Sequence, residues 1–83
     1  MAEEEIGRVT HYFNKIGVAG IELTGQLSVG DTIHIKGHTS DWAQEVGSIQ
    51  IEHEFVEVGK AGDSVGIKVD GHAHEHDAVY RVT

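Results

Sequence analysis

Glycine recurs along the chain at intervals of 3 to 12 residues, and proline is absent. The segments between the glycines are short and rich in Val, Ile and Thr, the residue types that favour strands. Short β-branched segments separated by turn residues are typical of an all-β meander. Because the chain has only 83 residues, it has room for one small core and one domain.

Six segments have the pattern of a strand, at 6–13, 18–23, 32–36, 42–54, 64–69 and 78–82. The clearest is 32–36, where Ile33 and Ile35 alternate with His34 and Lys36. Such alternation places the two isoleucines on one face and the polar side chains on the other, as on a half-buried strand.

Six or seven strands in so short a chain predict a small closed or nearly closed antiparallel β-barrel, because closure is the simplest way to protect strand edges. In this prediction, 42–54 is one longer strand with a β-bulge at Gly47, where the alternation slips, and 55–63 is a loop. The single barrel domain is expected to span 6–83, preceded by a flexible acidic N-terminus at 1–5.

The charge balance limits the partners that the chain can take. Six Lys and Arg residues against fourteen Asp and Glu residues give a formal net charge of -8, which repels nucleic acid phosphates and anionic lipid at long range. Cysteine is absent, which excludes disulfides and thiolate chemistry. The N-terminus is acidic where a signal peptide is basic, and no apolar stretch approaches the ~20 residues of a membrane span. We therefore expect a cytoplasmic protein that contacts no membrane.

Three separated motifs resemble one known family. Gly-Asp-Thr-Ile at 30–33, Val-Gly-Ser-Ile-Gln at 46–50 and Ala-Gly-Asp-Ser-Val-Gly-Ile at 61–67 have the order and spacing of the second domain of translation elongation factors of the Tu type. The resemblance covers about residues 6–82 and implies a stand-alone barrel of the domain II type. It also implies a non-enzymatic binding module that docks on a protein or ribonucleoprotein partner and is associated with translation. Similar barrels also occur as add-on modules, for instance at the end of collagenase-like peptidases.

The catalytic parts of that family are missing from the sequence. No G-x-x-x-x-G-K-[ST] phosphate loop is present, so the chain is not expected to hydrolyse GTP. Ser48 has no G-x-S-x-G sequence around it, and Ser64, in Gly-Asp-Ser-Val-Gly at 62–66, is expected in a strand and not in the strand-to-helix elbow of a hydrolase. The sequence therefore predicts no enzymatic activity and no cofactor.

Two positions bear on transfer RNA binding. The family's Gly-Arg-Val corresponds to Gly20, Ile21 and Glu22, so an arginine that would meet a phosphate is lost. An acidic strand residue near the family's terminal-adenosine pocket corresponds to Gln50, which still offers hydrogen bonds to a base edge or a 2′-hydroxyl. Together with the net charge, these differences argue against autonomous transfer RNA binding.

Trp42, Gln50 and His53 are the candidate partner-binding residues. Tryptophan is enriched at interface hot spots, although Trp42 is equally well explained as a core plug at one end of the barrel. Gln50 is a candidate because the resemblance places it near the family's terminal-adenosine pocket. His53 begins one of the two rim loops, 37–42 and 53–62, that are expected to contact a partner because connecting loops carry function on rigid scaffolds.

The segment 71–77 contains three of the seven histidines, His72, His74 and His76. On an extended strand, His72 and His74 point to the same side roughly 6.5–7 Å apart, close enough for both imidazoles to reach one zinc or nickel ion. His76 joins them only if the segment bends. The remaining ligand candidates are His11, His34, His38, His53, Glu75 and Asp77. The alternative function is a small metal-binding or metal-sensing protein, and the alternative interpretation of the segment is a solvated polar loop.

Overall fold

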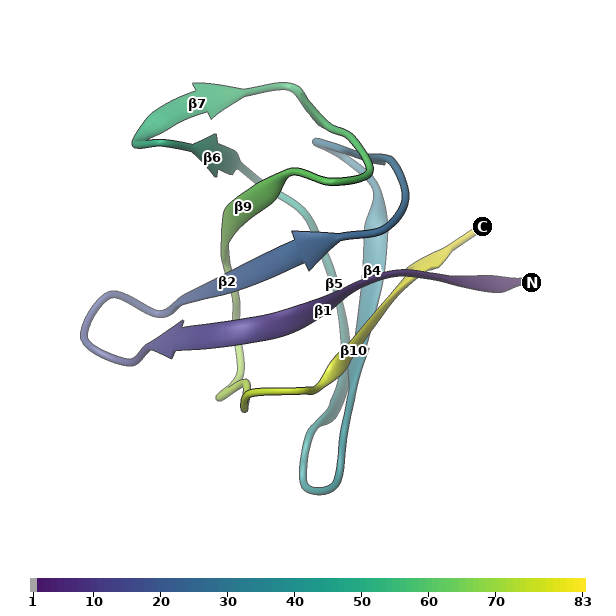
Figure 1. Cartoon of the computed structure of the whole chain (residues 1–83). Coiled ribbons are helices and arrows are strands. Elements are labelled where there is room, and N and C mark those ends of the chain that lie inside the picture. Colours follow the sequence, from purple (N-terminus) through teal and green to yellow (C-terminus); the bar gives the residue numbers. More distant parts are fainter. Residues whose placement is uncertain (1) are drawn as a thin grey trace.

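The computed structural model describes residues 2–83, in which every regular element is a strand (Figure 1). Met1, part of the N-terminus predicted to be flexible, lies outside the described residues. The strands are β1 (Glu3–Phe13), β2 (Val18–Leu23), β3 (Leu27–Ser28), β4 (Thr32–Lys36), β5 (Asp41–Glu45), β6 (Ile49–Ile51), β7 (Glu54–Val56), β8 (Val58–Gly59), β9 (Ser64–Lys68) and β10 (Ala78–Val82). All of their pairings are antiparallel, so the all-β antiparallel prediction is confirmed. The described part contains no helix long and apolar enough to cross a membrane.

Eight strands form one sheet in the order β5-β4-β10-β1-β2-β9-β6-β7, and β3 pairs with β8 in a second, small sheet. Figure 1 shows the large sheet strongly curled, with β4 and β5 behind β1 and β2, and with β6 and β7 at the top. Within residues 2–83, no backbone pairing joins β5 to β7. The prediction of a closed barrel is therefore wrong, and the fold has ten strands where six or seven were expected.

The strand predicted at 42–54 is not continuous: it contains most of β5, all of β6 and the first residue of β7, with the predicted bulge at Gly47 in the gap between β5 and β6. In this gap, Val46 donates its N–H to the carbonyl of Asp31 (2.8 Å) and accepts the N–H of Gly30 (2.9 Å). The N–H and the carbonyl of Val46 therefore bond to the turn at 30–31 and do not continue the hydrogen bonds of a strand. The chain leaves the edge at β5 and joins the other end of the sheet at β6.

The loop predicted at 55–63 also contains strands. It holds most of β7, which pairs with β6, and all of β8, which pairs with β3. Just beyond β3, Val29 donates its N–H to the carbonyl of Glu57 (2.9 Å). The small β3–β8 sheet therefore fastens the connection before β4 to the segment after β7.

Side chains cover the free edge of β5. Gln44 donates from Nε2 to the carbonyl of Lys68 (3.0 Å), and its Oε1 accepts the N–H of Asp70 (2.7 Å). Trp42 donates from Nε1 to the same oxygen (2.9 Å), and its ring lies so close to Gly71 that a Cβ there would be 3.0 Å from ring carbons. The segment after β9 is thus attached to β5 through two side chains instead of a backbone ladder.

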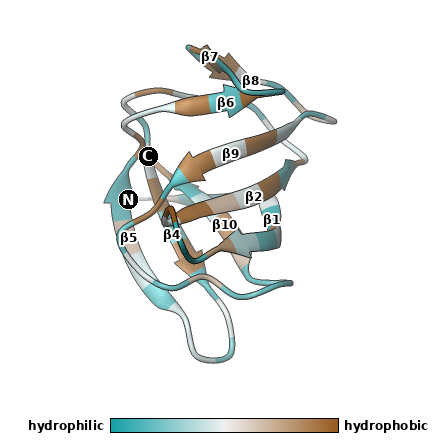
Figure 2. Cartoon of the chain, turned by 90° about the vertical axis from the view of Figure 1, so that its left-hand side faces the viewer, coloured by the Kyte–Doolittle hydropathy of each residue, from teal (hydrophilic) through white to brown (hydrophobic). Residues whose placement is uncertain are grey.

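Inward-facing strand positions build one apolar core. Ile33 and Ile35 of β4 are buried, as their alternation predicts, and so are Val65 and Ile67 of β9. Figure 2 shows hydrophobic residues interleaved with polar ones along the strands. The largest fully buried side chains are all aliphatic: Ile6, Val9, Ile21, Leu23, Leu27, Ile33, Ile35, Val46, Ile49, Ile67 and Val79. Truncating a buried Leu or Ile to alanine typically costs ~2–5 kcal/mol.

The first strand starts before residue 6, where it was expected to begin. Glu3 is already in β1 and pairs with Val82 of β10. Next to this pair, Ala2 and Thr83 exchange two backbone hydrogen bonds, of 3.1 and 2.8 Å. The two ends of the described chain consequently lie side by side (Figure 1).

Candidate functional site

The outer face of the sheet carries a row of residues that has no side chains in its middle. Cross-strand partners run from Phe55 through Gln50, Gly66 and Gly20 to His11, across β7, β6, β9, β2 and β1. Partners on antiparallel strands lie on the same face, so the row is continuous. The two central glycines place no side chain of their own on this face and leave a hollow at Gly66, where the Val18 side chain is the nearest neighbour.

This hollow lies in a groove of about 310 Å³, here called the outer groove. Its lining residues are Phe13, Ile16, Val18, Gln50, Glu52, His53, Ser64 and Gly66. Phe13 is 47% exposed, Ile16 is 62% exposed, and Phe55, the cross-strand partner of Gln50, is 73% exposed. Isolated exposed apolar residues are ordinary, but a group of large ones around a groove marks an interaction site.

One end of the outer groove is formed by the turn between β6 and β7. Glu52 and His53 make this two-residue turn with φ values of 51° and 68°. Left-handed backbone at both positions normally calls for Asn-Gly, and each non-glycine residue in this region costs on the order of 1–3 kcal/mol. The turn therefore holds a carboxylate and an imidazole at the groove at the expense of backbone strain.

Two of the three predicted partner-binding residues lie together in this groove, and the third does not. Gln50 and His53 both line it. Trp42 is on β5, at the other end of the sheet order, where it packs on Gly71 and bonds to Gln44. The role of Gln50 and His53 remains a prediction. Sequence reasoning missed Phe13 and Ile16, whose signal was one large apolar residue directly before a turn and another within it.

The histidine segment does not assemble a metal site. The ring of His72 contacts the rings of Tyr12 and His74, with centroid distances of 4.5 and 4.7 Å and interplanar angles of 40° and 33°. His76 has a φ of 74° and donates its N–H to the carbonyl of Val9 (2.8 Å). Among residues 2–83, no three His, Cys, Asp or Glu side chains converge to hold a metal ion. The three histidines His72, His74 and His76 are thus not brought together in the described residues, since His76 is held in the turn before β10, and the predicted metal site is not supported.

Asp77, a ligand candidate in the sequence, is instead buried in the fold. Its Oδ2 accepts the N–H of His74 (2.9 Å), and its carboxylate fills the space next to Gly37. Both observations give the residue a structural role, closing the turn before β10.

Ser40, His74 and Asp77 lie together, which calls for comparison with a hydrolase triad. Ser40 Oγ is 3.0 Å from Nδ1 of His74, and Oδ2 of Asp77 is 4.0 Å from the same Nδ1. In a triad the serine and the aspartate contact opposite nitrogens of the imidazole. Ser40 is also only 3% exposed. This arrangement has neither the relay geometry nor the access that a nucleophile needs.

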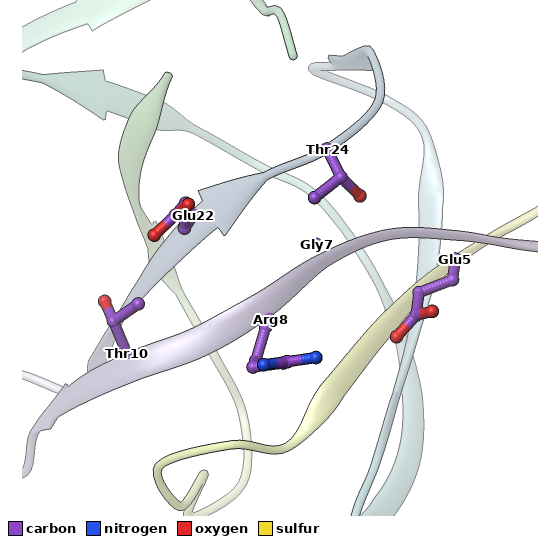
Figure 3. A pocket seen from close by; sticks show the side chains of 6 residues that line it. All are labelled: Glu5, Gly7, Arg8, Thr10, Glu22 and Thr24. Carbon is purple, nitrogen blue, oxygen red and sulfur yellow. The ribbon is translucent and has the colours of Figure 1, made fainter. Parts of the chain in front are cut away.

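A second hollow of about 220 Å³ is lined by Glu5, Gly7, Arg8, Thr10, Glu22 and Thr24. Figure 3 shows Arg8 with the carboxylates of Glu5 and Glu22 on its two sides. The hydroxyl of Thr10 is used internally, because it donates to the carbonyl of Gly20 (3.2 Å). The hollow thus presents charged, exposed side chains of both signs and no nucleophile next to a base.

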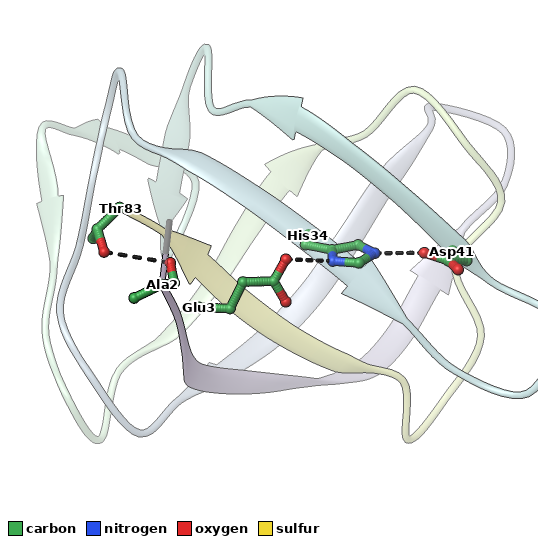
Figure 4. A network of polar contacts seen from close by, with 5 residues as sticks. All are labelled: Ala2, Glu3, His34, Asp41 and Thr83. Carbon is green, nitrogen blue, oxygen red and sulfur yellow. Dashed lines mark hydrogen bonds and ion pairs between the residues drawn. The ribbon is translucent and has the colours of Figure 1, made fainter.

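His34 joins β1, β4 and β5 (Figure 4). Its Nδ1 is 2.8 Å from Oε2 of Glu3, and its Nε2 is 2.5 Å from Oδ1 of Asp41. A neutral imidazole has one N–H and cannot donate to both carboxylates. The hydrogen bond to Asp41, and after it the one to Glu3, raises the pKa of His34 above 6.5. The hydrogen bond between His34 and Asp41 also lowers the pKa of Asp41. The sequence indicated the outward position of His34 but not this network, because Glu3 was assigned to a flexible N-terminus.

The Gly-Asp motifs behind the resemblance to elongation factors are turn-forming sequences in this structure. Asp31 accepts the N–H of Ser28 through Oδ2 (2.9 Å), and Asp63 accepts the N–H of Lys60 in the same way (2.9 Å). The preceding glycines have φ values of 97° and 94°. Side chains that bond to backbone three residues away specify local turns, which recur in unrelated antiparallel folds. The motifs therefore carry information about turns and none about a function.

Comparison with known proteins leads to peptidases. No family profile matches the chain. A protein of Methanocaldococcus jannaschii named an uncharacterized protease is 47% identical over 77 residues, which are 92% of this chain and 19% of that protein. The chain thus spans about a fifth of the relative's length.

Solved structures agree in fold. The C-terminal domain of a protein described as a U32 peptidase from Geobacillus thermoleovorans superposes with a TM-score of 0.90 at 18% identity, covering 96% of this chain and 93% of that one. The selenomethionine variant of that domain gives a TM-score of 0.87 at 19% identity, with 92% and 96% covered. The elongation factor resemblance, and the translation or ribonucleoprotein association expected from it, are corrected by these findings. The chain is similar in sequence to a segment of a named protease and in fold to a C-terminal domain of a U32 peptidase.

Proposed function

We propose that the chain is a protease-associated domain, which serves a U32-type peptidase as an accessory domain and is not itself the hydrolase. The 47% identity over 92% of the chain to a protein named a protease carries this proposal. The fold shared with the C-terminal domain of a U32 peptidase is consistent with it. Since the match covers only 19% of the relative, the rest of such a protein has ample length for a separate catalytic domain.

The side-chain geometry supports a non-catalytic role. The one serine within hydrogen-bond distance of a histidine in the described chain is Ser40, and it is buried beside a wrongly placed carboxylate. The outer groove, in contrast, offers apolar and polar groups suited to binding.

The experiment combines the chain with the Methanocaldococcus protease from which the matching segment has been deleted. Association is measured by isothermal titration calorimetry, and hydrolysis of labelled casein and gelatin is followed in parallel. We expect the two parts to bind, the chain to restore hydrolysis that the deletion reduces, and the chain alone to cleave neither substrate. Cleavage by the chain alone that disappears in Ser40→Ala would contradict the accessory role, and so would a deleted protease that is fully active and ignores the chain.

A further inference from the structure

The outer groove collects most of the exposed apolar surface of the chain. Four large hydrophobic residues of the described part are exposed, namely Phe13, Ile16, Phe55 and Val58. The first two line the groove and Phe55 flanks it. They come from the β1–β2 and β6–β7 hairpins, whose turns lie on the same side of the molecule (Figure 1). Two hairpins far apart in the sequence therefore present their apolar residues to one hollow.

The shape of the outer groove favours an extended polypeptide over a small molecule. Small-molecule pockets are enclosed and bury roughly 70–90% of their ligand. The outer groove is open, since Ile16 and Phe55 are 62% and 73% exposed beside it. An extended polypeptide alternates its side chains between two faces, so it needs only one face covered. Its backbone amides can bond to the Gln50 amide and the Ser64 hydroxyl, which are two of the polar groups of the lining.

The charged residues at the outer groove indicate which charge a bound segment should carry. Glu52 is the acidic residue of the lining, and no Lys or Arg is among the lining residues. Glu22, the cross-strand partner of the lining residue Ser64, adds a second acidic residue next to the groove. Lys68, the cross-strand partner of Val18, and Lys15, in the β1–β2 turn, lie toward the other end. A partner therefore meets negative charge at the β6–β7 end of the groove.

We infer that the outer groove docks an extended polypeptide segment in which an apolar side chain is flanked by Lys or Arg. The apolar side chain fits against Gly66 and Val18, between the apolar residues of the two hairpins, and a basic side chain lies against Glu52. The inference deepens the proposed function, since a polypeptide is what a peptidase handles.

The test measures peptide binding to the chain alone by fluorescence anisotropy. The probe is a fluorescein-labelled hexapeptide of alternating lysine and valine, and the comparison peptide has glutamate in place of lysine. We expect the lysine peptide to bind at least about tenfold more tightly than the glutamate peptide, because like charges are rejected. Equal binding of the two peptides, or binding of neither, would overturn the inference.

Matched variants locate the site. Phe55→Ala is expected to weaken binding about tenfold, as truncation of an exposed aromatic anchor does, while Val58→Ala, outside the groove, leaves binding unchanged. Glu52→Gln is expected to weaken binding, and Glu75→Gln, the same loss of charge in the histidine segment, is not. All four residues are exposed, Val58 being the less exposed of the two apolar ones at 37%, and melting curves verify that each variant folds.

Sedimentation velocity distinguishes the remaining occupant, a second copy of the chain. If the chain dimerises and Phe55→Ala makes it monomeric, the groove is a self-interface and the inference is wrong. Peptide binding does not depend on any peptidase. Its failure therefore leaves the proposed association with a peptidase standing, and failure of that association leaves the peptide result unaffected.

Discussion

The carboxylate of Asp77 occupies the space that any side chain at Gly37 would need, since a Cβ there would overlap Asp77 Oδ1. The contact joins the loop after β4 to the turn before β10, and it accounts for Asp77, the one buried acid of the described residues. Gly37 is thus required by steric exclusion, not by its backbone conformation.

Gly37→Ala is expected to lower the free energy of unfolding by about 1–3 kcal/mol or more, the usual cost of overpacking. Gly47→Ala is the matched control, because a Cβ there meets nothing within 4 Å, and reduced flexibility of the unfolded chain should make it neutral or slightly stabilising. Urea denaturation of both variants checks this. Equal stability of the two would contradict the role given to Asp77.

The His34 network predicts a pH dependence of stability. The folded-state pKa of His34 is raised above 6.5, so its contribution is complete below the unfolded pKa and is lost as pH rises through the folded pKa. The lowered pKa of Asp41 sets the acid limit, because its contribution disappears as pH falls through that value. His34→Gln should therefore destabilise most in mildly acidic solution and least at alkaline pH.

Melting temperatures measured in buffers from about pH 4.5 to about pH 9 check this prediction. His38→Gln removes an exposed histidine from a neighbouring loop and is the control. Of the other groups nearby, Tyr80 lies 6.4 Å from the His34 ring, and Lys36 acts on Asp41. If His34→Gln and His38→Gln give the same pH profile, the network contributes nothing to folding.

The strained turn between β6 and β7 predicts a stabilising substitution. His53 has a φ of 68°, and glycine adopts this conformation without the steric cost of a side chain, so His53→Gly should raise the free energy of unfolding by about 1 kcal/mol. His38→Gly, at a loop position without positive φ, should instead be slightly destabilising. Denaturant midpoints compare them, and a destabilised His53→Gly would show that the turn is not strained.

The side-chain bridge at the free edge of β5 predicts a local change in dynamics. Gln44→Ala removes the acceptor of the Asp70 N–H, so this amide should exchange with solvent faster. The Val69 N–H bonds to the carbonyl of Gly17 and is the internal reference. Amide hydrogen exchange by NMR makes the comparison, and unchanged protection at Asp70 would mean that the bridge does not fasten this segment.

Local sequence patterns predicted those strands whose alternation is unbroken. The alternation of Ile33 and Ile35 placed β4 correctly, and the same pattern placed β9. The break after β5 escaped prediction because it depends on Val46, which is apolar and buried whether it continues a strand or bonds to a turn. The two-residue strands β3 and β8 are too short for any period to be visible.

The candidate site was only partly predictable. Gln50 and His53 were candidates from the sequence, but the residues next to them in the groove were not. Phe13 and Ile16 come near them only through the pairing of β2 with β9 and of β9 with β6. Such pairing between distant segments is not encoded in local alternation. The Gly-Asp turns misled the prediction of the family. They are a local signal for a turn, and this signal suggested a family that the comparisons do not support.

The most direct test of the account is a chimera in which this chain replaces the 77 matching residues of the Methanocaldococcus protease. The kcat/KM for a casein substrate is measured for the intact protease, the chimera and the protease without the segment. We predict that the chimera retains activity close to that of the intact protease, while the shortened protease loses it. Equal activity of the shortened and intact proteases, or a folded chimera as inactive as the shortened form, would contradict an accessory role for this domain.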